Sequence, residues 1–355
     1  MAASTREQVL APVQQRGQEA LVRLGLPTRK HEAWRLTNLG RLEAVARMPI
    51  SSVATASDAP PRLDDVVRLV LDGVNDPLEG VTLPEGLTPL EPKELELALG
   101  HTLDRCGWSD DWLIEFNHAS AQQLLALRVR GTVPPVEITM AAASGLIPTR
   151  VLLVVEEKAQ LELLQVFSAR GEAAHSHLLE VHLGQEAQLN HGVLACADGV
   201  ASLFAQCAVE QEPRSTYTFT SVVQGWSLGR IEPRVIQVDG QASTTLKGLA
   251  VADAEQQLAV HTSVCFEGPD GELDQLQKCL AAGRSHTIFN GAINVPRKAQ
   301  RTNAAQLSRN LLLSDRARVD TKPELEIVAD DVRCAHGATV SQLQEDELFY
   351  LRSRG

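Results

Sequence analysis

The sequence predicts a mainly β protein whose strands follow a helical N-terminal region. Beyond about residue 123, short runs of alternating apolar and polar residues recur, separated by Gly, Asp, Asn and Pro. Long helical patterns are absent between these runs, which argues against a doubly wound α/β fold. Aromatic residues make up only 4% of the 355 residues, so the core must be mostly aliphatic. A sandwich, a barrel and a β-solenoid all remain compatible with this pattern.

Residues 1–120 are predicted to form a mainly helical region. Apolar residues recur at helical spacing from Val9 to Leu24, and Gly25 and Pro27 end that helix. The stretch Met48–Pro61 is rich in Ser, Ala and Pro and is expected to be a loop. Further helices are expected at His31–Val45, Pro92–Leu103 and Trp112–Leu127.

Residues 121–340 are predicted to hold the β core. The clearest strand is Thr216–Val223, in which Tyr217, Phe219 and Val223 share one face. In His177–Leu183, three apolar side chains share a face opposite Glu180 and His182. Other strands are expected at Val151–Val155, Gln188–Leu194, Ser202–Val209, Ile231–Val238, Ser243–Ala250, Leu258–Phe266 and Ser285–Val295. Residues 341–355 are predicted to begin a new helix.

Composition argues against several classes of function. The formal net charge is −12 and no Lys/Arg run occurs, so we expect no nucleic-acid partner. The sequence has no apolar stretch of 18 residues and no signal-peptide pattern, so we expect a cytoplasmic protein without a membrane span. The six cysteines form no C-x-x-C pair and are expected to be reduced thiols. Motifs of nucleotide-binding loops, zinc proteases and serine hydrolases are also absent.

Four metal-capable side chains lie within seven positions near the C-terminus. They are Asp330, Asp331, Cys334 and His336. Cys334 and His336 are two apart and so share a strand face, with Cα atoms roughly 7 Å apart, which suits one metal or cluster. The alternative is a buried small cysteine beside a hydrogen-bonded turn histidine, because C-x-H is not a structural zinc spacing. Asp330 has the same parity and either orients His336 or is a solvated carboxylate.

Two other pairs of residues combine metal-capable side chains at matching strand parity. His175 and His177 share a strand face, but no cysteine or carboxylate cluster adjoins them, so we expect solvated surface histidines. His261 and Cys265 have matching parity but lie about 13 Å apart along a strand, which favours structural roles.

Longer motifs carry a resemblance to a known family. They are P-E-L-E-I-V-A-D-D-V-R-C-A-H-G-A-T-V at 323–340, E-L-F-Y-L-R-S-R-G at 347–355, and the stretch from Asn290 to Ser314. Together with L-G-L-P-T-R-K-H-E-A-W-R-L-T-N-L at 24–39, they resemble the SufB/SufD family of iron–sulfur cluster assembly proteins. The last motif is similar to that of SufD rather than SufB. The resemblance implies a right-handed parallel β-helix between helical terminal regions, which would also account for the aliphatic composition.

The same resemblance implies a function. It suggests a non-catalytic scaffold subunit in a complex with SufB and the ATPase SufC, in which SufB pairs through the β-helices and SufC binds C-terminal helices. A transient iron–sulfur cluster would form at the SufB interface, with His336 and Cys334 as candidate positions, and the isolated chain would hold no cofactor. In a photosynthetic eukaryote the location would be the plastid stroma. Self-pairing as a homodimer is plausible when SufB is absent.

Two expectations follow from details of the match. In the family a C-terminal helical region continues past S-R-G, whereas this sequence ends at Gly355, so we expect a truncated region and weak or absent SufC binding. Trp34 in the H-E-A-W-R motif is expected to anchor the N-terminal helices. Two rival functions stay open: a purely architectural partner of SufB without a metal role, and a carbohydrate-active β-solenoid enzyme.

Overall fold

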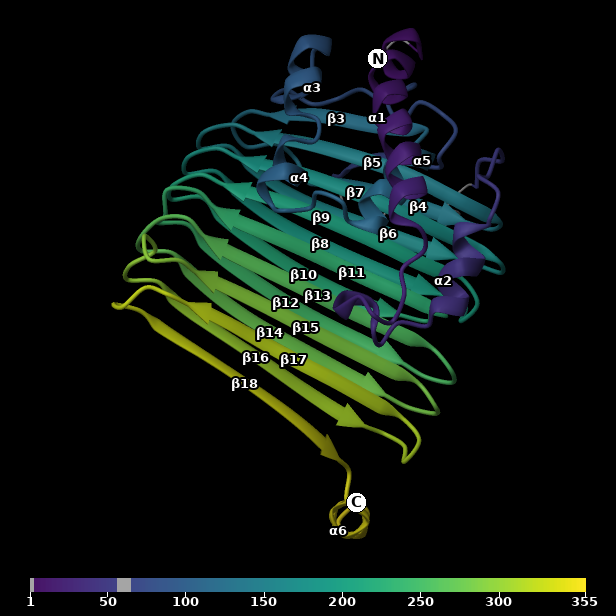
Figure 1. The fold of residues 1–355 in the computed structure, drawn as a ribbon, viewed down its shortest axis with the longest axis vertical. Helices are drawn as coiled ribbons and strands as arrows, with labels where there is room; N and C mark the ends of the chain where they lie inside the picture. Colours follow the sequence, from purple (N-terminus) through teal and green to yellow (C-terminus); the bar gives the residue numbers. More distant parts are fainter. Residues whose placement is uncertain (1–2, 56–64) are drawn as a thin grey trace.

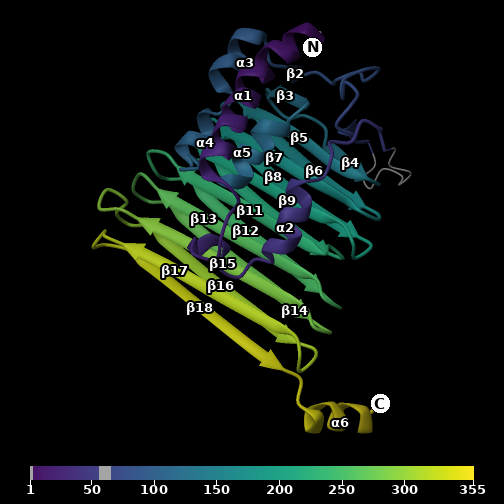
Figure 2. The same cartoon turned by 45° about the vertical axis from the view of Figure 1, so that its right-hand side comes forward.

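Two stacked nine-stranded sheets form the core of the protein (Figures 1 and 2). A computed structural model describes residues 3–55 and 65–355. The chain alternates between the sheets, and neighbouring strands within each sheet run parallel except for β2, which is antiparallel to β3. This arrangement is a β-solenoid of about 8 turns. It confirms the predicted fold class and excludes the two alternatives, a sandwich and a barrel.

The strand order shows the alternation directly. One sheet holds β1 (Val67–Val70), β4 (Val136–Ala142), β6 (Gln160–Ala169), β8 (Gln188–Ala197), β10 (Thr216–Gln224), β12 (Ser243–Ala252), β14 (Glu272–Ala281), β16 (Asn303–Leu312) and β18 (Arg333–Gln342). The other holds β2 (Leu87–Pro89), β3 (Gln123–Val129), β5 (Gly145–Val155), β7 (Ala173–Leu183), β9 (Ser202–Gln211), β11 (Leu228–Gln237), β13 (Gln257–Phe266), β15 (His286–Val295) and β17 (Arg318–Ile327). All nine strands predicted between Val151 and Val295 are present. The strands β4, β6, β14 and β16 were not predicted.

The interior of the solenoid is built by side-chain alternation. Along β10, Tyr217, Phe219 and Val223 are buried as predicted, while intervening threonines are exposed or half-buried. Phe219 lies in register with His191 on β8 and Leu246 on β12, so each turn places its inward residues over those of the next. Repetition of this register produces one continuous, mainly aliphatic core.

The N-terminal helices cover the outer face of the sheet that contains the odd-numbered strands from β3 (Figure 2). They are α1 (Ala3–Leu24), η1 (Glu32–Trp34), α2 (Leu39–Ala46), α3 (Pro92–Ala98), α4 (His101–Arg105) and α5 (Trp112–Ser120). This cover explains why Glu180 on β7 is buried although it points away from the interior: its carboxylate lies 2.9 Å from the guanidinium of Arg150, itself 1% exposed. As predicted, Trp34 is a buried anchor, with its ring 6.0 Å from that of Trp112.

Three predicted helices differ from the structure. Trp112–Leu127 was wrong beyond Ser120, because residues 123–129 form β3. Leu125 and Leu127 face the interior while Leu124 packs under α1 and α3, so both faces of β3 are buried and its apolar run has no strand period. The other two helices are interrupted, one between α3 and α4 at Gly100 (φ 86°) and one between η1 and α2.

The first and last predicted helices are confirmed. The first ends at Leu24, before Gly25, and the last is α6 (Glu345–Ser353), which projects beyond β18 (Figure 1). Of the expected loop Met48–Pro61, residues 56–61 lie outside the described residues, and the rest holds one isolated bridge at Ile50. All six cysteines are free thiols. Within the described ranges, no helix is both long and apolar enough to cross a membrane.

Candidate functional site: the open C-terminal turn

The last turn of the solenoid is formed by β17 and β18. Each pairs with one neighbour only, β17 with β15 and β18 with β16, so each leaves one strand edge unpaired within the described chain. Among residues 3–55 and 65–355 no further turn covers these two strands, and apolar residues here are exposed: Ile327 by 40%, Val328 by 57% and Val340 by 49%. The predicted site residues therefore lie on an open surface.

Cys334 and His336 lie side by side in this turn. They are in register with Ala304 and Gln306 on β16, whose side chains are buried in the solenoid interior. Cys334 and His336 therefore share the inward-facing side of β18, as their parity predicted. Cys334 is half-buried against the core, and this burial raises the pKa of its thiol. His336, one step along the strand, is exposed.

The two aspartates of the motif lie in the turn between β17 and β18, and both are exposed. The Asp331 backbone fixes the turn: its carbonyl accepts a hydrogen bond from Arg301 N (2.6 Å), and its N–H donates to Gln300 Oε1 (3.0 Å). Across residues 3–55 and 65–355, no three His, Cys, Asp or Glu side chains converge as a metal site. Cys334 and His336 are thus two candidate ligands without a third His, Cys, Asp or Glu beside them in the described part of the chain.

The predicted surface location of His175 and His177 was wrong. Both are buried inside the solenoid, with exposures of 0% and 1%. Their positions have the same parity as Leu179, Val181 and Leu183, which all face the core, and this parity was the signal that could have placed them. Burial lowers the pKa of His175 to about 4 and that of His177 to about 3, so both are neutral at pH 7.

His177 belongs to a hydrogen-bonded chain that crosses the interior. Its Nδ1 lies 2.8 Å from Thr149 Oγ1, and its Nε2 lies 2.8 Å from Gln165 Nε2. Because the amide nitrogen of Gln165 can only donate, His177 accepts at Nε2 and carries its proton at Nδ1. The Thr149 hydroxyl in turn lies 3.9 Å from Met140 Sδ, which is the last member of the hydrogen-bonded network on this side.

On the other side of Gln165, the hydrogen-bonded network continues to a cysteine. Gln165 Oε1 accepts from His191 Nε2–H (2.9 Å), so His191 Nδ1 accepts from the Tyr217 hydroxyl (3.0 Å). The Tyr217 oxygen lies 3.7 Å from Cys207 Sγ. Burial lowers the pKa of His191 to about 3 and raises that of Cys207 to about 12, so every member is uncharged at pH 7. Sequence reasoning missed this buried network.

His261 and Cys265 lie on the outer face of β13, four positions apart. Cys265 is half-buried, and His261 lines a cavity beneath the 3₁₀ turn η1. Burial, together with the nearby Arg230 guanidinium, lowers the pKa of His261 to about 3. Arg230 itself lies over the ring of Trp34, 4.8 Å from its centroid, and pairs with Glu232 at 2.6 Å.

The fold and the C-terminal motif agree with one family. The model described as SUF system FeS cluster assembly, SufBD core domain, matches residues 138–355. The chain belongs to the SufB/SufD family. Within it, SufD of Escherichia coli is 30% identical over 363 residues, covering 97% of this chain and 84% of that protein.

Further relatives of this SufB/SufD protein come from photosynthetic organisms. An iron–sulfur cluster assembly SufBD family protein of Synechocystis is 31% identical over 393 residues, covering 100% of this chain and 84% of the relative. The chloroplastic protein ABCI7 of Arabidopsis thaliana is 38% identical over 210 residues, covering 58% of this chain and 44% of ABCI7. Membership gives the chain a role in iron–sulfur cluster assembly by the Suf system, and the relatives named SufD place it nearer to SufD.

Proposed function

We propose that this chain is a non-catalytic scaffold subunit that pairs with a SufB subunit through its open C-terminal turn. The observation that carries the proposal is the position of Cys334 and His336 on β18, beside an unpaired strand edge and exposed apolar residues. Exposed strand edges favour pairing with another chain. A partner strand added at β18 would place its own side chains next to this pair.

In this proposal the cluster is cargo assembled between two subunits. Thiolate and imidazole nitrogen are both ligands of iron in proteins. Burial disfavours the thiolate form of Cys334, so a nearby metal would be needed to deprotonate it at neutral pH. His336 is exposed and supplies a neutral nitrogen ligand, which adds no negative charge to a cluster that must later be released.

The proposed third partner is the ATPase SufC. The family resemblance assigns its binding to the C-terminal helical region, to which α6 belongs. Phe349, Tyr350 and Leu351 of α6 are 76%, 59% and 65% exposed, which provides an apolar surface for contact. ATP turnover would then be supplied by SufC, consistent with a non-enzymatic role for this chain.

The test measures iron and labile sulfide in this chain co-purified anaerobically with SufB and SufC. The comparison is wild type against His336→Ala, with His101→Ala as a matched control because His101 is an exposed histidine on α4. We expect His336→Ala to lower the cluster content of an intact complex, and His101→Ala to leave it unchanged. Equal cluster content in all three complexes would contradict a ligand role for His336.

A purely architectural role is the second candidate. It is favoured by the absence, among the described residues, of any group of three metal-capable side chains. A double variant, Cys334→Ala with His336→Ala, separates the two roles. Full cluster loading of a stable complex would support architecture alone, whereas loss of cluster from a stable complex would support the assembly site.

A further inference from the structure

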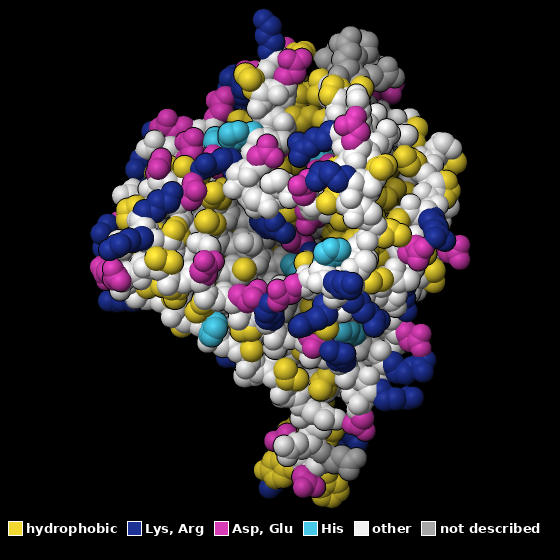
Figure 3. Space-filling model, in the orientation of Figure 1, with side chains coloured by type: hydrophobic (Ala, Val, Ile, Leu, Met, Phe, Trp, Pro, Cys, Tyr) yellow, Lys and Arg dark blue, Asp and Glu magenta, His cyan; other side chains and the backbone are white. Residues whose placement is uncertain are grey.

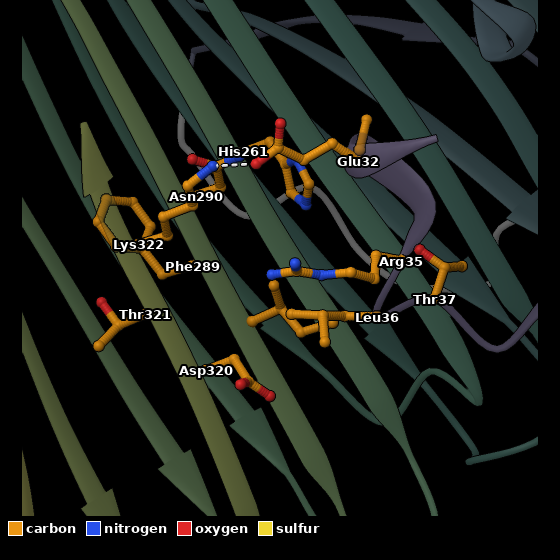
Figure 4. Close-up of a pocket in the computed structure, with 12 residues that line it drawn as sticks. Glu32, Arg35, Leu36, Thr37, His261, Phe289, Asn290, Asp320, Thr321 and Lys322 are labelled. Atoms are coloured by element: carbon orange, nitrogen blue, oxygen red, sulfur yellow. Dashed lines mark hydrogen bonds and ion pairs between the residues drawn. The ribbon is translucent and has the colours of Figure 1, made fainter. Parts of the chain in front are cut away.

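A cavity of about 340 Å³ lies between the H-E-A-W-R segment and the outer face of the solenoid (Figure 4). Its floor is formed by β13, β15 and β17, and its wall by residues 32–37. Side chains of both charge signs gather over this part of the surface (Figure 3). The wall is held in place by Trp34, which is buried between Trp112 and Arg230.

The floor carries a row of aligned polar side chains. His261 is in register with Asn290, and Asn290 with Lys322, so the three stack across neighbouring strands about 4.8 Å apart. The Asn290 side-chain oxygen is buried and has no hydrogen-bond partner among the described residues. A buried acceptor without a partner is costly, and because Asn290 lines the cavity, a half-turn of its amide group would present this oxygen to a donor bound there.

Of the charged side chains that line the cavity, only Arg35 makes no ion pair with a described residue. Lys322 is paired with Glu32 from the wall and with Glu324, and Asp320 is paired with Arg318 (2.6 Å) and His286 (2.6 Å). Arg35 remains. Its guanidinium extends from the wall over the floor in Figure 4, and its charge adds to that of Lys322 in lowering the pKa of Glu32.

We propose that this cavity binds a small carboxylate that also carries a hydroxyl or amino donor. The carboxylate would pair with the Arg35 guanidinium, whose planar fork matches it. The donor would satisfy the Asn290 oxygen, and neutral His261 would offer a second polar contact. Leu36 and Ile288 supply apolar contacts for the carbon chain. The volume is within the range of small-molecule sites.

Two probes that differ by one hydroxyl test the proposal on the full-length chain: phenyllactate and phenylpropionate, followed by calorimetry or ligand-observed NMR. We expect phenyllactate to bind more tightly. Arg35→Gln should weaken binding of both probes about tenfold, the effect of losing one charge-assisted hydrogen bond. Asn290→Ala should remove the preference for phenyllactate while retaining binding of both probes.

Arg29→Gln is the matched control, because Arg29 is an exposed arginine of the same segment outside the cavity lining. It removes the same charge and should leave both affinities unchanged. Equal weakening by Arg29→Gln and Arg35→Gln would reduce the effect to general surface charge and overturn the site. Failure of the wild type to bind either probe at millimolar concentration would overturn it as well. Neither result depends on cluster loading or on SufB.

Discussion

The buried histidines of the solenoid interior should make stability fall steeply on mild acidification. His175, His177 and His191 are 0%, 1% and 2% exposed, and burial lowers their pKa values to about 4, 3 and 3. In the unfolded chain each would have a pKa of about 6.5. Between these values the unfolded state binds protons that the folded state does not, so stability is present above about pH 6.5 and is lost as pH falls.

The magnitude can be worked out for a step from about pH 7.5 to pH 5.5. At the lower pH, each of these imidazoles is protonated in roughly nine-tenths of the unfolded molecules. This protonation lowers the free energy of unfolding by about 1.4 kcal/mol per histidine. The three interior histidines together therefore cost about 4 kcal/mol, a large share of typical domain stability. This figure needs only that the folded-state pKa values lie well below 5.5 and does not depend on their exact values.

The perturbation is His191→Gln, which keeps groups able to hydrogen-bond Gln165 and Tyr217 but removes the titrating ring. Urea denaturation at both pH values gives the free energies of unfolding. We expect the acid-induced loss to be smaller than in wild type by about 1.4 kcal/mol. His31→Gln, at an exposed position, serves as control and should behave as wild type. An acid-induced loss equal to that of wild type would refute the reasoning, because His191 would then titrate alike in both states.

Three further predictions concern packing. Glu180→Ala should cost about 3–5 kcal/mol because it leaves the buried Arg150 guanidinium without its counter-charge, and a loss below about 1 kcal/mol in urea denaturation would contradict this. Gly225→Ala should lower the melting temperature more than Gly131→Ala: both have positive φ, but only at Gly225 would the new Cβ lie 2.1 Å from a backbone oxygen. Equal shifts would argue against that clash. Trp34→Ala should cost about 3–5 kcal/mol and release the N-terminal helices to limited proteolysis before the solenoid is cut; simultaneous digestion would count against an anchoring role.

How far the strands could be predicted depended on which residues face inward. β10 alternates aromatic or aliphatic residues with threonine, and its burial followed directly from the sequence. β14 and β16 escaped prediction because they place glutamines inside. Gln275 donates to Thr262 Oγ1 (2.7 Å), and Gln306 donates to Gln275 Oε1 (2.9 Å). These glutamines form their hydrogen bonds only after the turns have stacked. The sequence of either strand alone therefore shows no regular alternation of apolar and polar residues.

At the candidate site, too, some features follow from the local sequence and others only from the stacking of the turns. The parity of Cys334 and His336 along one strand is local, and the sequence predicted it. Their exposure depends on β18 being the last strand of its sheet, which only the stacking order reveals. The cavity below η1 joins residues 32–37 to strands more than 220 positions later, and no spacing in the sequence links them. Contacts of this kind arise from the docking of the N-terminal segment on the finished solenoid.

The two ends of the solenoid differ, and this difference bears on how the proposed scaffold would work. At the first turns, the N-terminal helices lie over the sheet that contains β2, β3 and β5, whereas at the last turn β17 and β18 have one neighbour each among the described residues and His336 is exposed. A partner that pairs with β18 would remove water from Cys334 and His336 in the same step that it buries the strand edge. Complex formation and metal binding would then be coupled, because each stabilises the arrangement that the other needs. A ligand variant is therefore expected to weaken the complex as well as the cluster, and cluster content has to be compared at equal amounts of assembled complex.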